Sequence, residues 1–233
     1  MNEGSTIGAG PRKKFQFVGR ALCLDFCNTV GGKRGVRPRE YLNSYSDFLS
    51  WCEQAELIDG STWRALGRKV SSNSGEAEEI LGRAIALRES VYLIFLAIRD
   101  RKKPLERDLA ALNSELGKSL NRMRVAPMRN GFEWAWQPPT GELDYPLGPI
   151  ARSAAELLIS SALLMNIRQC QGENCGWLFL DSSKNHSRCW CDMRDCGNRA
   201  KVRRHRMRSQ DKSQGSTSKI QRRSKHQRPT LTY

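Results

Sequence analysis

Apolar residues recur at intervals of three and four along several stretches of this 233-residue chain, a pattern typical of amphipathic helices. The strongest pattern covers 77–101, where Ile80, Leu87 and Val91 share one face with other apolar side chains. Weaker patterns predict helices over 45–55, from a capping Ser61 to Val70, from Pro104 to Leu116 and over 146–165. A loop is expected at 71–75.

Shorter runs predict a few β-strands. Residues 15–18 and 22–26 read as strands separated by Gly19-Arg20. Asn130-Gly131 favours a β-hairpin, and Phe132, Trp134 and Trp136 alternate, so they should share one strand face. The expected fold class is α+β: a mostly α-helical N-terminal domain with a few short antiparallel strands, followed by a small C-terminal module.

Composition excludes two classes of protein. With 39% hydrophobic and 27% charged residues, the chain is neither an integral membrane protein nor a disordered polyelectrolyte. Its longest unbroken apolar run, 91–98, is far shorter than the about 20 residues of a membrane helix. The N-terminus lacks the layout of a signal peptide, so we expect a cytoplasmic protein.

The net charge of +15 is distributed unevenly. Residues 167–233 carry 16 Lys and Arg against 5 Asp and Glu, whereas the preceding 166 residues carry 23 against 19. This asymmetry predicts a nearly neutral folded domain with a basic appendage that binds polyanions. Residues 210–233 are rich in Ser, Gln, Lys and Arg, which predicts a basic disordered tail.

Eight cysteines point to a metal site. Cys23, Cys27 and Cys52 lie among apolar residues and are expected in the core, whereas five cysteines fall within 170–196. Cys170 and Cys175 form a C-x4-C pair, and Cys191 and Cys196 form a second such pair; fifteen residues lie between the two pairs. Four thiolates would enclose one structural Zn²⁺ and leave no position for a catalytic water.

A fifth cysteine competes for the ion. Cys189 and Cys191 are two residues apart, and pairing Cys191 with Cys196 repeats the first spacing, so Cys189 is predicted to be excluded. His186 could replace a sulfur, but we interpret it as a solvated loop residue.

The segment after the last cysteine predicts a basic helix that contacts nucleic acid. Residues 199–208 contain one histidine and no acid, and their six basic residues are Arg199, Lys201, Arg203, Arg204, Arg206 and Arg208. Such a helix fits the DNA major groove, where Arg bridges phosphates or reads guanine edges. Asn198 is expected to cap it. Single-stranded RNA is the alternative, with Trp177, Phe179 and Trp190 as stacking platforms, although packing around the hairpin is the favoured role of these rings.

Two stretches resemble known families. Residues 175–181 (CGWLFLD), followed by Trp190-Cys191 and by 196–201 (CGNRAK), resemble the CGNR zinc finger. Residues 24–29 (LDFCNT) and 154–158 (AAELL) resemble the ABATE domain of bacterial stress-induced transcription regulators. The family usually has Arg where Cys189 stands. The resemblance implies an ABATE-like domain over 15–165 and a treble-clef-like zinc finger over 166–209.

The resemblance implies a zinc-dependent, DNA-binding transcription regulator in the bacterial cytoplasm, associated with the nucleoid. No common catalytic motif is present, so we expect no enzyme. Asp25 and Asn28 could line a ligand pocket with Trp134 or Trp136, although binding of backbone groups is the simpler interpretation. The rival hypothesis is a sensor or enzymatic N-terminal domain whose finger serves assembly. A homodimer would fit short DNA modules, which gain affinity by pairing.

Overall fold

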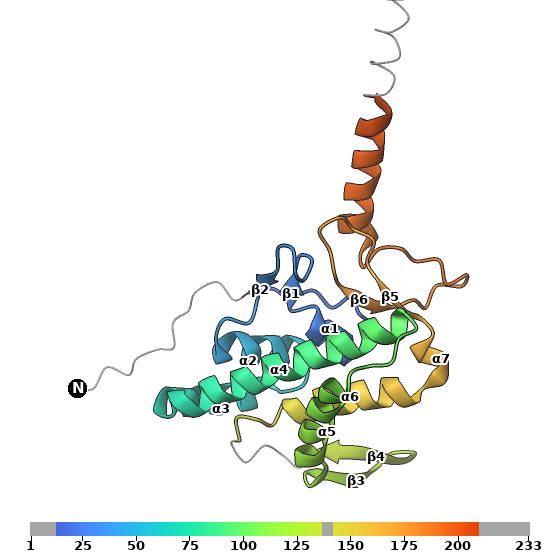
Figure 1. Ribbon diagram of the computed structural model, residues 1–233. Helices are drawn as coiled ribbons and strands as arrows, with labels where there is room; N and C mark the ends of the chain where they lie inside the picture. The colour runs from blue at the N-terminus through green and yellow to red at the C-terminus, as the bar shows by residue number, and fades with distance from the viewer. Residues whose placement is uncertain (1–12, 137–141, 210–233) are drawn as a thin grey trace, which may run out of the picture. The chain divides into compact units, whose positions relative to one another are not determined.

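The computed structural model describes residues 13–136 and 142–209, so the predicted tail over 210–233 lies outside the described residues (Figure 1). The chain divides into two compact units between Cys191 and Asp192. The elements of the first unit are α1 (Leu22–Cys27), β1 (Val30–Gly31), β2 (Arg39–Glu40), α2 (Tyr45–Gln54), α3 (Gly60–Ser72), α4 (Ser74–Arg99), α5 (Glu106–Leu120), β3 (Met123–Met128), β4 (Gly131–Trp136), α6 (Leu147–Ile159), α7 (Ser161–Leu164), β5 (Ile167–Gln169) and β6 (Leu178–Leu180).

The α+β class is confirmed, because helices dominate and the strands pair only as short antiparallel ladders, β1 with β2, β3 with β4 and β5 with β6. The long helix α4 supplies the centre of the core, where Ala84, Leu87, Val91 and Phe95 are buried. It packs against α1, α2, α3, α5 and α6. No helix among the described residues is long and apolar enough to cross a membrane.

The predicted strand over 22–26 is wrong, since Leu22–Cys27 forms the helix α1. Five successive residues of α1 are buried, including Cys23 and Cys27. Apolar residues lie on both sides of Asp25 without a helical or an alternating pattern, so periodicity could not separate a short buried helix from a buried strand. Residues 15–18 are also not a strand. The predicted burial of Cys23, Cys27 and Cys52 is confirmed.

Three predicted helix boundaries also move. Asp59, not Ser61, caps α3: its Oδ1 accepts from the backbone N–H of Thr62 at 2.7 Å and from Ser61 Oγ at 2.8 Å. The loop expected at 71–75 shrinks to Asn73, which ends α3 and caps α4. The helix expected over 146–165 is interrupted at Ser160, whose backbone is extended.

The predicted hairpin is confirmed. Met128 pairs with Gly131, which leaves Arg129-Asn130 as a two-residue loop. Phe132 and Trp134 are 75% and 55% exposed.

The segment 166–191 is built into the first unit. The hairpin β5–β6 contributes Ile167, Leu178 and Leu180 to the same hydrophobic core as α4. The side-chain amide of Asn28 extends this contact: its Nδ2 donates to the carbonyl of Leu178 at 2.9 Å, and its Oδ1 accepts the backbone N–H of Leu178 at 2.9 Å. Asn28 therefore pairs with β6 as another strand would.

Three further bonds join this segment to the N-terminal residues. Trp177 Nε1 donates to the carbonyl of Val30 at 2.8 Å, Gly176 N–H to Gly32 at 3.0 Å and Leu180 N–H to Gly19 at 2.9 Å. The residues between the two cysteine pairs are thus fixed by contacts far away in the sequence.

The second unit begins with a capped turn. Asp192 Oδ1 accepts the backbone N–H of Arg194 at 2.7 Å, and a π-helical turn, η1 (Met193–Gly197), leads into an α-helix over 198–209. The predicted cap, Asn198, instead donates from Nδ2 to the carbonyl of Arg194 at 3.0 Å. The cap lies earlier because the helical conformation begins before the expected start.

Replacing Asn28 tests how strongly the segment 166–191 depends on the N-terminal residues. We expect Asn28→Ala to lower the free energy of unfolding by about 2–4 kcal/mol, because it leaves the N–H and C=O of Leu178 buried without partners. Urea denaturation measures the change. The matched control, Asn43→Ala, alters an exposed asparagine and should stay within about 0.5 kcal/mol of wild type. Equal effects of the two substitutions would contradict the role of Asn28.

Candidate metal centre and nucleic-acid interface

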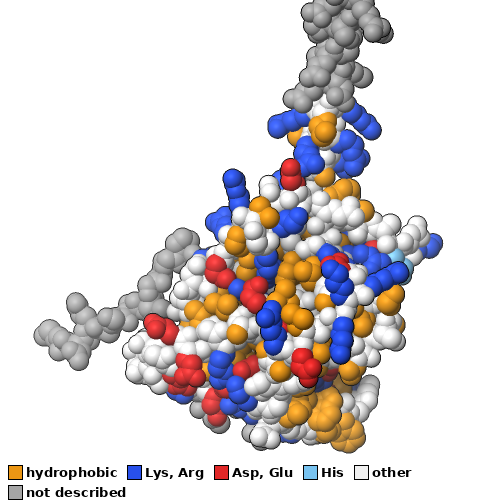
Figure 2. Space-filling view, viewed as in Figure 1, with side chains coloured by type: hydrophobic (Ala, Val, Ile, Leu, Met, Phe, Trp, Pro, Cys, Tyr) orange, Lys and Arg blue, Asp and Glu red, His pale blue; other side chains and the backbone are white. Residues whose placement is uncertain are grey.

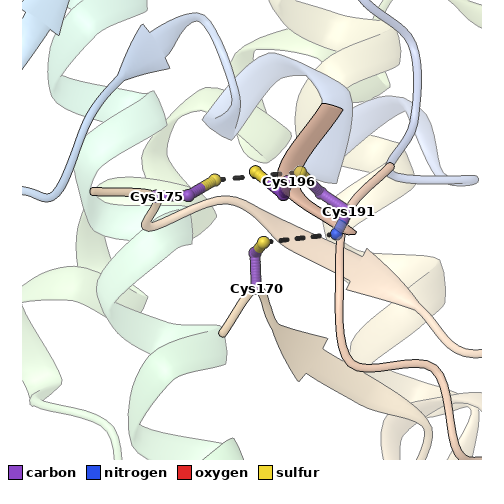
Figure 3. A group of neighbouring side chains, drawn as sticks. All are labelled: Cys170, Cys175, Cys191 and Cys196. Carbon is purple, nitrogen blue, oxygen red and sulfur yellow. Dashed lines mark hydrogen bonds between the residues drawn. The ribbon is translucent and has the colours of Figure 1, made fainter. Parts of the chain in front are cut away.

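Four cysteine side chains converge near the C-terminal end of the described chain. The Sγ atoms of Cys170, Cys175, Cys191 and Cys196 all lie within 4.8 Å of one another (Figure 3). Those of Cys175 and Cys191 are 3.8 Å apart. A tetrahedral zinc site with Zn–S bonds of about 2.3 Å places its sulfurs about 3.8 Å apart, so this donor set fits one zinc ion.

The β5–β6 hairpin positions the first two cysteines. Cys170 follows β5 directly, and its backbone N–H donates to the carbonyl of Trp177 at 2.8 Å. Cys175 is held in the connecting turn by a bond from its N–H to the carbonyl of Gly172 at 3.0 Å. The Sγ of Cys170 accepts backbone N–H groups from Gly172 at 3.4 Å and from Cys191 at 3.3 Å, contacts that favour a thiolate.

Asp181 and Arg188, which are not among the predicted functional residues, shape the loop that leads to Cys191. The two carboxylate oxygens of Asp181 accept the backbone N–H groups of Ser183 at 3.0 Å and of Arg188 at 2.9 Å. Arg188 donates to the carbonyls of Trp190 and Cys191 and lies over the ring of Phe179. In the sequence, the position of the acidic Asp181 directly after an apolar stretch was the signal that could have indicated this role.

The thiols of the cluster shift one another's protonation. Hydrogen bonds from Cys175 and Cys191 lower the pKa of Cys170 to about 2. The same contacts raise the pKa of Cys175 to about 12, with Cys170 as the main cause, and also raise that of Cys191. Without a cation, the cluster therefore favours a thiolate at Cys170 and protonated thiols at Cys175 and Cys191. A divalent cation would offset the repulsion among the sulfur charges, so the thiols of Cys175 and Cys191 would release their protons when it binds.

The other predicted alternatives for the metal site lie outside the cluster. Cys189 is not among the four converging cysteines, and its sulfur lies 3.4 Å from the carbonyl of Ser187. His186 is also not a member of the cluster, and its Nδ1 lies 3.0 Å from the carbonyl of Asp181.

The helix over 198–209 presents the predicted basic residues to solvent. All six, Arg199, Lys201, Arg203, Arg204, Arg206 and Arg208, are exposed, and Figure 2 shows Lys and Arg side chains along this helix. Arg199 Nη2 contacts Asp195 at 3.1 Å and the Cys196 sulfur at 3.2 Å. A cavity of about 500 Å³ within the second unit is lined by Arg194, Arg199, Arg203 and Arg206, among others.

The aromatic rings considered for RNA stacking differ in exposure. Trp177 is 9% exposed and Phe179 is fully buried, while Trp190 is half-buried.

The predicted ligand-pocket residues hold backbone groups or lie on the surface. Asp25 Oδ1 accepts the backbone N–H of Gly19 at 2.7 Å, and burial raises the pKa of this carboxyl to about 6. Both amide atoms of Asn28 are used by Leu178. Trp134 is largely exposed on β4, with the guanidinium of Arg152 5.8 Å from its ring centre. The side chain of Trp136 lies outside the described residues.

Comparison with known families finds two family models that match successive parts of the chain. The ABATE family model, described as "Putative stress-induced transcription regulator", matches residues 20–161. The chain belongs to the ABATE family. A second family model, the CGNR zinc finger, matches residues 166–209 of this ABATE protein and contains all four converging cysteines. No curated protein matches the chain.

Family boundaries and packing boundaries differ in this ABATE protein. The CGNR zinc finger begins at residue 166, yet its hairpin β5–β6 shares the core of the ABATE domain. The finger's first three cysteines therefore belong to the first compact unit.

Metal analysis of paired cysteine variants tests the donor set. We expect wild-type protein to hold one zinc ion per chain, Cys191→Ser to lose it and Cys189→Ser to retain it, because only the first substitution removes one of the four converging sulfurs. Inductively coupled plasma mass spectrometry of protein purified under reducing conditions measures the stoichiometry. Loss of zinc from Cys189→Ser with retention in Cys191→Ser would reverse the assignment.

Proposed function

We propose that this ABATE protein is a zinc-dependent transcription regulator that binds duplex DNA through the helix over 198–209. The observation that carries the proposal is the exposure of six basic residues on a helix that follows directly from the last cysteine of the metal cluster. The description of the ABATE family supports a role in transcription, and the positive charge of the helix supports binding of a polyanion.

Charge density explains why a polyanion is the expected partner. Residues 199–208 carry six basic side chains and no acid, so an isolated helix of this sequence repels itself. In the preceding turn, Asp195 pairs with Arg199 at 3.1 Å, but two acids, Asp192 and Asp195, stand against the six basic residues of the helix. Phosphates would relieve the repulsion, and release of their counterions drives such binding.

The cavity of the second unit suggests where one phosphate binds. Arg194, Arg199, Arg203 and Arg206 line it around a single acid, Asp195. Guanidinium groups bind phosphate oxygens in pairs, so this cluster suits a backbone phosphate while residues further along the helix approach the bases.

Burial of two of the three candidate platforms favours duplex DNA over single-stranded RNA. Recognition of unpaired bases depends on exposed rings for stacking, yet Trp177 and Phe179 are packed in the interior. Action in the bacterial cytoplasm on the nucleoid, absence of catalysis and assembly as a homodimer remain predictions that accompany this proposal.

Charge reversal on the helix should weaken the interaction strongly. We expect Arg203→Glu with Arg206→Glu to weaken binding of the zinc-loaded protein to duplex DNA by about 100-fold at low salt and to reduce the slope of log K against log salt by about 2. The matched control, Lys102→Glu with Lys103→Glu, makes the same change in net charge at exposed lysines of the first unit. It should leave the slope nearly unchanged.

Fluorescence anisotropy with a labelled duplex, repeated with a single-stranded RNA of equal length, measures these affinities. Wild-type affinity should fall by about 10³-fold between 50 and 200 mM salt if six phosphate contacts form. Binding that ignores salt, tighter binding to the RNA, or equal losses in both double variants would contradict the proposal.

A further inference from the structure

A cavity of about 830 Å³ opens in the first unit, and its lining contains none of the four converging cysteines and none of the pocket residues predicted from sequence. It lies among the loop that follows β1, residues 88–99 of α4 and the strand β5. Its volume falls within the range of small-molecule sites. We propose that it binds an organic anion: a carboxylate attached to an apolar body.

The lining is positively charged overall. Lys33, Arg34, Arg88 and Arg99 line the cavity, and only Glu40 and Glu89 oppose them. Arg88 is buried and holds both acids, at 2.7 Å for Glu40 and 2.8 Å for Glu89. Arg34 also pairs with Glu89, at 2.8 Å, and the four cations of the lining exceed its two acids by two charges.

Two of those cations have capacity for an anion. Lys33 is exposed and makes no ion pair within 13–136 and 142–209. Arg34 donates from Nε to Glu89 and from Nη2 to Glu89 and to the carbonyl of Cys27. Its Nη1 is buried and has no hydrogen-bond partner among the described residues. A buried donor without a partner is unfavourable in free energy, so binding of an acceptor oxygen next to Arg34 would be favoured.

Other residues of the lining are apolar. Leu93 and Leu96 lie one turn apart on α4, and Leu93 is 40% exposed although it is a large hydrophobic residue. The Tyr92 ring is covered by the guanidinium of Arg34 at 3.6 Å. A ligand with a hydrocarbon body can thus bury Leu93 while its carboxylate meets Lys33 and Arg34. An inorganic anion without a hydrocarbon body would leave Leu93 exposed.

The cavity is connected to the metal centre through short hydrogen bonds. Gln169, which lines it, donates to Tyr92 Oη at 2.9 Å, and Tyr92 Oη donates to the carbonyl of Gly176 at 3.1 Å. Gly176 follows the metal-ligating Cys175, and its N–H bonds to Gly32, next to Lys33. If the proposed regulatory function holds, an anion bound here is the effector. Binding itself does not depend on that function.

A charge series of six-carbon ligands tests the site on the full-length, zinc-loaded protein without DNA. Hexanoate, hexan-1-ol and hexylammonium share one chain length and differ in charge. We expect hexanoate to bind with a Kd on the order of 1 mM, reasonable for so small a ligand, and the other two to bind at least about 10-fold more weakly. Nitrogen-15 NMR shifts should concentrate at 31–35, at 92–96 and at Gln169.

Lys33→Glu should weaken hexanoate binding by about 10-fold or more, whereas Lys103→Glu, at an exposed lysine outside the cavity, should change it by less than about 2-fold. Thermal melting checks that both variants fold. No hexanoate binding by wild type, equal binding of hexylammonium, or equal effects of the two substitutions would overturn the proposal. Because DNA is absent, failure of the DNA-binding proposal would leave this result intact.

Discussion

Four thiolates cannot share a sphere less than 5 Å across without a cation, and this constraint governs the segment 170–196 that holds the four cysteines. Hydrogen bonds within the cluster stabilise one thiolate, at Cys170, while the pKa values of Cys175 and Cys191 are raised. A divalent ion that satisfies all four sulfurs converts this repulsion into attraction. It also fixes Cys196, and with it the start of the basic helix.

Contacts with the ABATE domain hold the hairpin that carries two of the four cysteines. The hairpin that carries Cys170 and Cys175 shares its hydrophobic core with α4, and Asn28 pairs with Leu178 as a short extra strand. Folding of the ABATE domain and metal binding by the finger should therefore be coupled, since each holds the same hairpin. Because of this coupling, binding of a ligand to the ABATE domain would affect the residues next to the metal ion.

Sequence alone could predict what is local or regularly spaced. The C-x4-C pairs indicated the four converging cysteines, the spacing of apolar residues predicted α4, and Asn130-Gly131 predicted the β3–β4 hairpin. It could not separate a buried helix from a buried strand at Leu22–Cys27. It also missed the partner of Asn28 and the cavity beside Arg34, because both depend on contacts between residues far apart in the chain.

Zinc K-edge X-ray absorption of the purified, reduced protein tests the central claim most directly, since it counts the atoms bonded to the ion. The account predicts a single shell of four sulfur scatterers at about 2.3 Å and no oxygen or nitrogen ligand. A shell that contains nitrogen or oxygen, or a folded C-terminal segment in protein that carries no metal, would contradict it.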